Sequence, residues 1–353
     1  MKTVSYTEAY KQVLTPKVVS LLTRIHEYKG EQQAFIKEHD ESLQSYKRVA
    51  QFDHCKYSNK MEDIVTSDQR LSMLLHQQDL PQNEAEAQLL GYSTLLTIID
   101  ENQKFISLQP SMLQQLHQDL YQFSHSKGGD YKTVDNVIME KRADGTSFVR
   151  FYPTPSAEVN HAMSASCHAY HQAIKEGYDP LIVIPMFLLD FLCIHPFMDG
   201  NGRMSRIITF LLLQQAQYEV MKYVSLDQEI YHQQALYYES LQASSIDWHK
   251  QDNDYEPFVS FFLQMVVKTC RTFQDTIVVP KKEFPSNRAR IAYLIKDHLG
   301  KISKADLMHA CPDISQTTMQ RCLTTLVKEH KVIQICKGRY AAYVWNHEDD
   351  EIL

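Results

Sequence analysis

The chain has 353 residues, a formal net charge of −7 and 44% hydrophobic residues, which is enough material for two domains with buried cores. Its seven cysteines are odd in number and lack any CxxC pair, which argues against a disulfide framework. There is no apolar signal core, and the longest apolar run, Leu181 to Leu189, is far below the roughly 18 residues of a membrane span, so the sequence favours a cytoplasmic globular protein without membrane contact.

Apolar residues recur at helical spacing along most of the chain before residue 278. The pattern predicts a mainly α-helical bundle, with an N-terminal helical region at 1–105 and a second region at 106–277. The clearest helices are predicted at 85–99, 111–123, 159–174 and 257–272.

One segment of this region alternates instead like two short strands. Residues about 134–152 surround Asp144-Gly145, a dipeptide typical of tight hairpin turns, so we predict a β-hairpin there. A surface ornament without function is the alternative interpretation.

Two strongly apolar helices are predicted next, at 180–194 and 203–216, the first broken near Pro185. Between them lies HPFMDGNGRMSR, residues 195–206, which holds two of the ten glycines of a glycine-poor chain. Gly-Asn-Gly adopts positive φ at low cost, so successive backbone N–H groups can converge on an anion. A helix that begins about Gly202 would direct its first-turn N–H groups at the same point.

The ligand that fits such a turn is a polyphosphate. Arg203 and Arg206 lie three residues apart and add planar donors for phosphate oxygens. Asp199 is a hard oxygen ligand suited to Mg²⁺ on a nucleotide, and His195 is the natural proton acceptor at neutral pH. The residues predicted to bind the nucleotide here are Gly200, Asn201, Gly202, Arg203, Met204, Ser205 and Arg206.

The same twelve residues resemble the Fic family signature HxFx(D/E)GNGRxxR at all eight fixed positions. A chance match at one start site has a probability of about 10⁻¹⁰ on uniform composition. The resemblance implies a Fic-type helical bundle that transfers AMP from ATP, with Mg²⁺ on the phosphates, to a Tyr, Ser or Thr hydroxyl of a target protein. His195 would be the base, and Phe197 would anchor the loop by packing.

Three further segments resemble parts of Fic proteins. The hairpin looks like the flap that aligns the target segment by strand addition. Tyr237 and Tyr238 look like tyrosines near the adenine, with core aromatics as the alternative. Residues about 55–70 resemble the inhibitory helix through Ser58 and Glu62, although Asp63 replaces the expected Gly or Asn. By that resemblance Glu62 would pair with Arg206 and restrain the enzyme.

Other functions remain open at this level. A regulator that merely senses ATP needs the anion site but no base, so His195 favours an enzyme. Some Fic relatives transfer a different phosphate-containing group. The target is an unidentified protein, with self-modification and self-association as further alternatives. A zinc site around Cys167, His168 and His171 is disfavoured because no fourth ligand is suitably spaced.

The C-terminal segment differs in charge, since residues 286–345 carry a net +6 and the rest of the chain −13. A linker at 278–287 precedes it. The pattern of residues 288–345 predicts three short helices and a hairpin that turns at Lys337-Gly338. This order of elements resembles a winged helix. In that resemblance, Ser315 to His330 would be the recognition helix and Arg339 would lie on the wing. DNA binding is one interpretation. Protein docking is favoured over it, because the third helix has few cations and the tail 346–353 is acidic.

Overall fold

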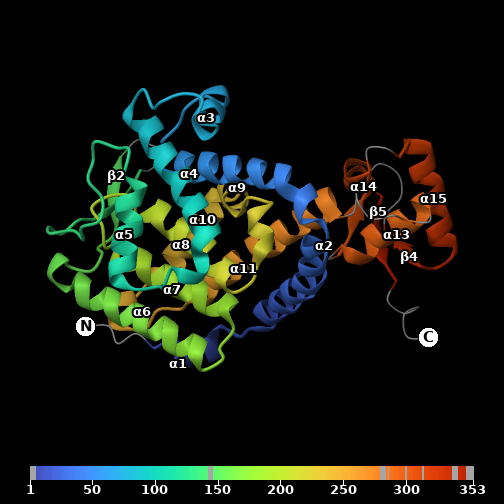
Figure 1. Ribbon diagram of the computed structural model, residues 1–353. Coiled ribbons are helices and arrows are strands. Elements are labelled where there is room, and N and C mark those ends of the chain that lie inside the picture. The colour runs from blue at the N-terminus through green and yellow to red at the C-terminus, as the bar shows by residue number, and fades with distance from the viewer. Residues whose placement is uncertain are drawn as a thin grey trace. The chain divides into compact units, whose positions relative to one another are not determined.

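The computed structural model describes residues 5–141, 146–278, 284, 286–298, 300–311, 314–335 and 341–346, and its chain forms two compact units, Met1–Cys270 and Arg271–Leu353. The first unit is mainly helical, as predicted (Figure 1). Its longer helices are α1 (Tyr6–Val13), α2 (Pro16–Lys60), α3 (Asp68–Leu75), α4 (Glu84–Asn102), α5 (Pro110–Leu120), α6 (Val159–Lys175), α7 (Pro180–Ile194), α8 (Asn201–Gln215), α9 (Leu226–His232), α10 (Gln234–Ser245) and α11 (Glu256–Phe273), the last crossing the unit boundary. Short helical turns are η1 (Gln103–Phe105), η2 (Ser156–Glu158), η3 (Glu219–Lys222), η4 (Trp248–Lys250) and η5 (Gln274–Val278).

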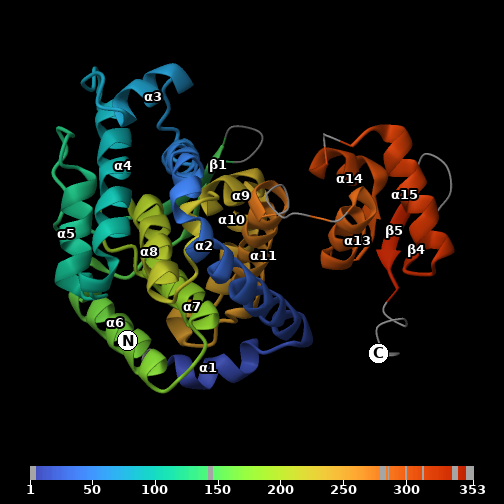
Figure 2. The same ribbon diagram turned by 45° about the vertical axis from the view of Figure 1, so that its right-hand side comes forward.

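Helices α7 and α8 form the centre of this unit, between α4 and α5 on one side and α11 on the other (Figure 2). Asp179 caps α7 by accepting a hydrogen bond from the Leu181 N–H, and Pro180 takes the first helical position. The predicted break near Pro185 is wrong, because α7 continues through it. The proline removes one backbone hydrogen bond, but buried side chains enclose the helix and packing holds it intact.

A buried carboxylate fastens other elements to α7. Asp190 accepts hydrogen bonds from the hydroxyls of Tyr6 and Tyr255, at 3.0 Å each, and from the indole N–H of Trp248 at 2.6 Å. These three donors satisfy a group that would be costly to bury alone. The N-terminal helix α1 is thereby fixed to the centre of the unit.

Helix α2 is 45 residues long and bends at His39, whose φ of −118° and ψ of 15° are not helical (Figure 1). It ends at Lys60, and Asp63 then adopts a left-handed φ of 58°. Residues 55–70, expected as one helix, are instead the end of α2, a turn, an extended segment and the start of α3. A left-handed residue cannot continue a right-handed helix, so Asp63 ends it.

The predicted hairpin is present as the antiparallel pair β1 (Ile138–Lys141) and β2 (Ser147–Phe151), with a register irregularity between Ile138 and Met139. Its turn at Asp144-Gly145 lies outside the described residues. Among the described residues, no helix combines the length and the apolar character that crossing a membrane requires.

The second unit has its own core and an antiparallel sheet of order β3-β5-β4. The predicted helices and strands are present, and β3 is an element that the sequence pattern did not predict. The elements are α13 (Asn287–Asp297), β3 (Ile302–Ser303), α14 (Lys304–Ala310), α15 (Gln316–Lys328), β4 (Val332–Gln334) and β5 (Ala342–Trp345). The predicted turn at Lys337-Gly338, Arg339 on the wing, most of the linker 278–287 and the tail after Asn346 lie outside the described residues.

Candidate active site

A cavity of about 530 Å³ lies within the first unit, where five parts of the chain meet. The end of α2 contributes Glu62 and Asp63, the hairpin contributes Met139 and Arg150, and the rest comes from α7, α8 and α10. The residues predicted from the sequence that line it are Glu62, His195, Gly202, Arg206, Tyr237 and Tyr238. The tertiary structure therefore gathers residues from positions 62 to 238 around one space.

His195 terminates α7 in a left-handed conformation, with φ 51° and ψ 62°. Its Nδ1 lies 3.4 Å from the carbonyl oxygen of Leu192, so Nδ1–H donates and Nε2 keeps its lone pair. Burial, aided by the nearby charge of Lys132, lowers the pKa of His195 to about 4. The imidazole is therefore neutral and able to accept a proton at physiological pH.

The loop after His195 is closed by its own asparagine. The Asn201 side chain accepts from the Phe197 N–H at 3.0 Å and donates to the Phe197 carbonyl at 2.8 Å. Gly200 has a φ of 76°, and a Cβ there would lie 2.9 Å from the Tyr121 hydroxyl, so this position requires glycine. Asn201 therefore shapes the loop through its side chain.

Helix α8 begins at Asn201, one residue earlier than predicted. The N–H of Met204 donates to the Gly200 carbonyl at 2.9 Å, so it is used within the helix. By their position at the start of α8, the backbone N–H groups of Asn201, Gly202 and Arg203 are the donors that a helix leaves for an anion. The backbone N–H of Ser205 also lies beyond the first turn of α8, so it is not one of these donors.

The carboxylate of Glu62 occupies the space in front of this helix start. A Cβ on Gly202 would overlap the Glu62 Oε1, and the same oxygen accepts a 2.7 Å hydrogen bond from the Arg206 Nη2. Arg206 also donates from Nε to the Ser58 hydroxyl and from Nη2 to the Ser58 carbonyl. Burial opposes the charge of Arg206, but the Glu62 carboxylate prevails and raises its pKa. An anion of the chain itself thus occupies the anion site.

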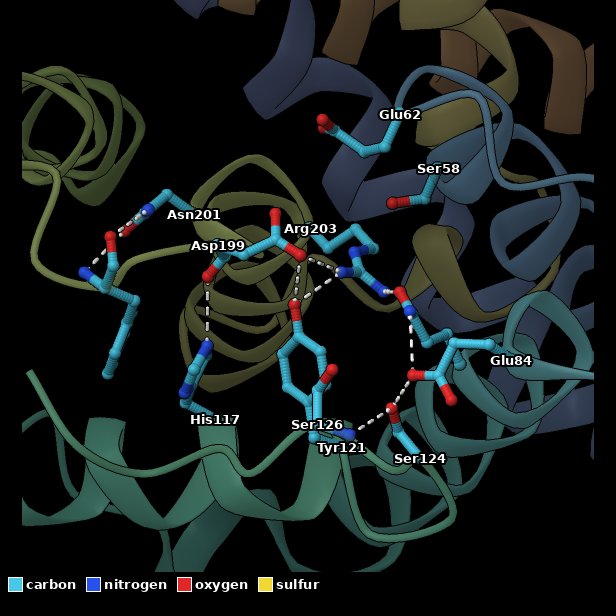
Figure 3. Close-up of polar contacts among 12 residues, drawn as sticks. Ser58, Glu62, Glu84, His117, Tyr121, Ser124, Ser126, Asp199, Asn201 and Arg203 are labelled. Atoms are coloured by element: carbon cyan, nitrogen blue, oxygen red, sulfur yellow. Dashed lines mark hydrogen bonds and ion pairs between the residues drawn. The ribbon is translucent and has the colours of Figure 1, made fainter. Parts of the chain in front are cut away.

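Arg203 lies one turn before Arg206 and has different partners. Its guanidinium is 1% exposed and donates to Gln88 Oε1 and to the Tyr121 hydroxyl, each at 2.7 Å (Figure 3). The Tyr121 hydroxyl in turn donates to Asp199 Oδ2 at 2.8 Å. Through Tyr121, Arg203 helps to position Asp199. Arg203 does not line the cavity, and its contact with phosphate stays a prediction.

His117 supports the loop from α5, as Figure 3 shows. Its ring stacks on Phe197 with centroids 3.7 Å apart, which fits the predicted anchoring role of that phenylalanine. The Gly129 N–H donates to His117 Nδ1, so Nε2 carries the hydrogen and donates to the Asp199 carbonyl at 3.1 Å. Burial lowers the pKa of His117 to about 4, which keeps this neutral tautomer.

Tyr237 and Tyr238 lie on the wall formed by α10. Tyr237 is buried, and burial raises its pKa to about 12. The hairpin reaches this wall through Arg150, which donates to the Tyr238 carbonyl at 2.6 Å and lies 5.7 Å from the Tyr238 ring centroid. The hairpin is therefore tied to the cavity wall, and a role of these tyrosines near the adenine stays a prediction.

Several residues of the site were not predicted. His117, Tyr121, Gln88 and Lys132 were absent from the predicted set, although His117 and Tyr121 are four apart on one helix and share a face. Lys132 is buried, donates to Asn136 Oδ1 at 2.8 Å, and has its pKa lowered by burial to about 8. The sequence signal was present only as spacing in α5.

Residues 107–213 match the model of the Fic/DOC family. This part of the chain is therefore similar to the Fic/DOC domain. That match includes the loop 195–206, and proteins with this domain are generally transferases of phosphate-containing groups.

Solved Fic proteins share the fold at low sequence identity. A Fic family protein of Desulfovibrio desulfuricans is 18% identical, with a TM-score of 0.62 over 94% of this chain and 97% of its own. A Fic domain containing signaling protein of Bacteroides thetaiotaomicron is 18% identical, with a TM-score of 0.56 over 72% and 94%. Fic-1 of C. elegans is 16% identical, with a TM-score of 0.59 over 75% and 74%. These similarities support the fold.

Cysteine and histidine clusters carry no metal site in the part of the chain that is described. Cys167 is a buried free thiol, and His171 bonds the Leu108 carbonyl through Nε2 at 2.8 Å. Five other cysteines are also buried, namely Cys55, Cys193, Cys270, Cys311 and Cys322.

Proposed function

We propose that this Fic/DOC domain transfers AMP from ATP to a hydroxyl side chain of a target protein, and that Glu62 restrains the reaction. The observation that carries the proposal is the single cavity that holds a neutral His195, the N-terminus of α8 and the guanidinium of Arg206. A base and an anion site facing one space suit attack of a hydroxyl on a phosphate.

In the proposed reaction the target oxygen attacks the α-phosphorus of ATP. A new O–P bond forms, the bond from the α-phosphorus to the bridging oxygen breaks, and pyrophosphate leaves. His195 Nε2 accepts the hydroxyl proton. The N–H groups at the start of α8 and the Arg206 guanidinium hold the phosphates and stabilise their developing charge.

The residues fit a magnesium ion carried on the nucleotide. The Asp199 carboxylate is exposed, and its Oδ2 accepts a hydrogen bond from the Tyr121 hydroxyl and lies 3.7 Å from the Arg203 Nη2. One or two carboxylates together with substrate phosphates are the usual ligands of Mg²⁺. When bound, the ion would neutralise phosphate charge, and Asp199 would hold it.

The restraint follows from the position of the Glu62 carboxylate. It lies where an anion would meet the Gly202 N–H and it engages the Arg206 guanidinium that a terminal phosphate would need. ATP would then bind with its α-phosphate misaligned for attack. Loss of the carboxylate or displacement of the end of α2 would open the site.

The test is incubation of the full chain with Mg²⁺ and ATP labelled at the α-phosphate, in the Glu62→Gly background, followed by mass spectrometry of modified proteins. We expect label on the chain itself or on an added target, and no transfer from ATP labelled at the γ-phosphate. His195→Ala in the same background should abolish labelling while Mg-ATP affinity stays within about threefold, since the anion site is intact.

The exposed His168 on α6 provides a matched control, and His168→Ala should label at the parent rate. Labelling by the His195→Ala variant at the parent rate would refute the assignment of the base. An adduct other than AMP would show that the domain transfers a different phosphate-containing group.

A further inference from the structure

The second unit exposes one continuous polar stripe along α15. The stripe consists of Gln316, Thr317, Gln320, Arg321, Thr324 and Lys328, which recur on one face of the helix. The opposite face packs Met319, Leu323 and Leu326 into the core of the unit. Core packing therefore fixes the direction in which the stripe points.

An open groove of about 590 Å³ runs along this stripe and is completed by Lys304 from the first turn of α14. The Lys304 ammonium donates to Gln320 Oε1 at 2.8 Å, which holds a positive charge over the helix. All residues that line the groove are polar or cationic, and none of them is acidic.

The cations of the groove have no ion pair with a carboxylate in the described part of the chain. Glu329, which follows α15, instead pairs with Arg288 at 2.6 Å and approaches Lys331 at 3.8 Å. Asp306 is engaged with Ser303 in the cap of α14. Among the described residues, Lys304, Arg321 and Lys328 therefore present positive charge that no carboxylate pairs, in a segment of net charge +6.

We propose that α15 enters the major groove of duplex DNA and reads base edges, a function separate from the proposed AMP transfer. Glutamine pairs with adenine and arginine with guanine through two hydrogen bonds each, and Gln316, Gln320 and Arg321 supply these groups. Lys304, Lys328 and the threonines fit phosphate and sugar oxygens. The helix directly before, α14, would cross the backbone, as in other helix-turn-helix readers.

A protein partner would need apolar surface at the same place, and the stripe offers none. Among the described residues of this unit, the exposed large apolar side chains are Ile333 and Ile335, which lie on and just after β4. Charge and hydrogen-bonding groups on α15 therefore favour nucleic acid over the docking module that the sequence favoured.

The experiment uses the full chain and a pool of random 30-base-pair duplexes, with repeated selection at 50 mM salt. We expect enrichment of a defined sequence, and Gln320→Ala should relax the preference at one or two positions, with about tenfold loss for the selected duplex. The triple variant Lys304→Gln, Arg321→Gln, Lys328→Gln should lose at least tenfold in affinity and about two units of the slope of log affinity against log salt.

The control is a second triple variant with the same net charge as the first. It replaces three exposed lysines of the first unit, as Lys11→Gln, Lys17→Gln and Lys175→Gln. It should bind the selected duplex within twofold of the parent chain. Equal losses in the two triple variants, or no enrichment of any duplex, would overturn the proposal. The proposal would also be overturned if the parent chain bound no DNA and the α15 triple variant instead changed self-association or binding to a protein. Thermal unfolding of each variant verifies that the second unit stays folded.

Discussion

Arg203 and Arg206 are one helical turn apart on α8, yet their side chains have different surroundings. Arg206 lines the cavity and donates to Glu62, whereas Arg203 is enclosed by Gln88 and Tyr121. Of these two arginines, Arg206 thus faces the candidate ligand site, whereas Arg203 maintains the shape of the loop.

Substitution of the two arginines should separate these roles. Arg203→Ala should lower the free energy of unfolding by about 1.5–3 kcal/mol, because two charge-assisted hydrogen bonds are lost and their acceptors, the half-buried Gln88 and the buried Tyr121, remain. Arg206→Ala in the Glu62→Gly background should mainly weaken Mg-ATP binding, by at least tenfold. Denaturant unfolding and calorimetric titration with Mg-ATP measure the two effects. Weak nucleotide binding by Arg203→Ala at unchanged stability would support direct contact with phosphate instead.

The buried histidines make stability depend on pH. The pKa of both His117 and His195 is lowered to about 4 by burial, below the ordinary value of about 6.5. Between these values the unfolded chain binds more protons, so the two groups' contribution is complete above pH 6.5 and is lost as pH falls toward 4. Between pH 6.5 and 4, each histidine should increase the slope of the free energy of unfolding against pH by at most about 1.4 kcal/mol per pH unit.

Denaturant unfolding at several pH values measures this slope, and His117→Gln should reduce it. The exposed His168→Gln provides the control. A slope that is the same for wild type and His117→Gln would contradict the burial argument. For His195 the same shift predicts that proton acceptance continues down to about pH 5, so kcat/KM should stay level from pH 8 to 5.

At the scale of elements, the proposed restraint depends on the turn after α2 and on the start of α8. Asp63, three residues after the end of α2, adopts the left-handed conformation, which aspartate tolerates better than most residues, so it can replace the Gly or Asn of the resembled motif. The turn places Glu62 against Gly202, and the Ser58 hydroxyl and carbonyl fix Arg206 beside it.

Glu62→Gly should raise AMP transfer, including self-modification, by more than tenfold, because about 1.4 kcal/mol of relieved restraint already gives a factor of ten. Arg206→Ala should block this gain, since the freed guanidinium is what the terminal phosphate needs. Asp63→Gly preserves the left-handed turn and serves as the matched control, with activity near wild type. The labelled-ATP assay measures all three, and equal rates for wild type and Glu62→Gly would contradict the restraint.

At the scale of the whole molecule, the chain combines two units with different chemistry. Every residue that lines the cavity lies in the unit Met1–Cys270, whereas the cationic groove of α15 lies in Arg271–Leu353. Each unit has a buried core of its own. The proposed site of transfer and the proposed DNA reader therefore lie in separate units.

A chain that ends at Pro285 should keep AMP transfer within about twofold of the full-length rate in the Glu62→Gly background, because it retains every residue of the cavity. The measurement is the labelled-ATP assay beside a thermal unfolding curve. The shortened chain should no longer bind the selected duplex. A folded but inactive product would show that the second unit contributes to catalysis.

The sequence by itself determined the helical architecture, the hairpin and the chemistry of residues 195–206. These features are local, because a glycine turn, a helix start and residues at i and i+3 follow from a few neighbouring positions. The element bounds agree with the predicted helices and hairpin, and the Fic/DOC match covers residues 195–206, whose chemistry stays a prediction. The continuity of α7 through Pro185 did not follow from local rules, since surrounding side chains compensate for the lost hydrogen bond.

Only the tertiary structure decided which side chains meet. Glu62 and Arg206 are 144 residues apart, and Gln88 and Arg203 are 115 apart, so no spacing in the sequence encodes their contact. The packing of α2, α4 and α5 around α8 directs Arg206 into the cavity and Arg203 into the interior. Such contacts depend on how helices distant in sequence cross, and a one-dimensional pattern records only which face of each helix is apolar.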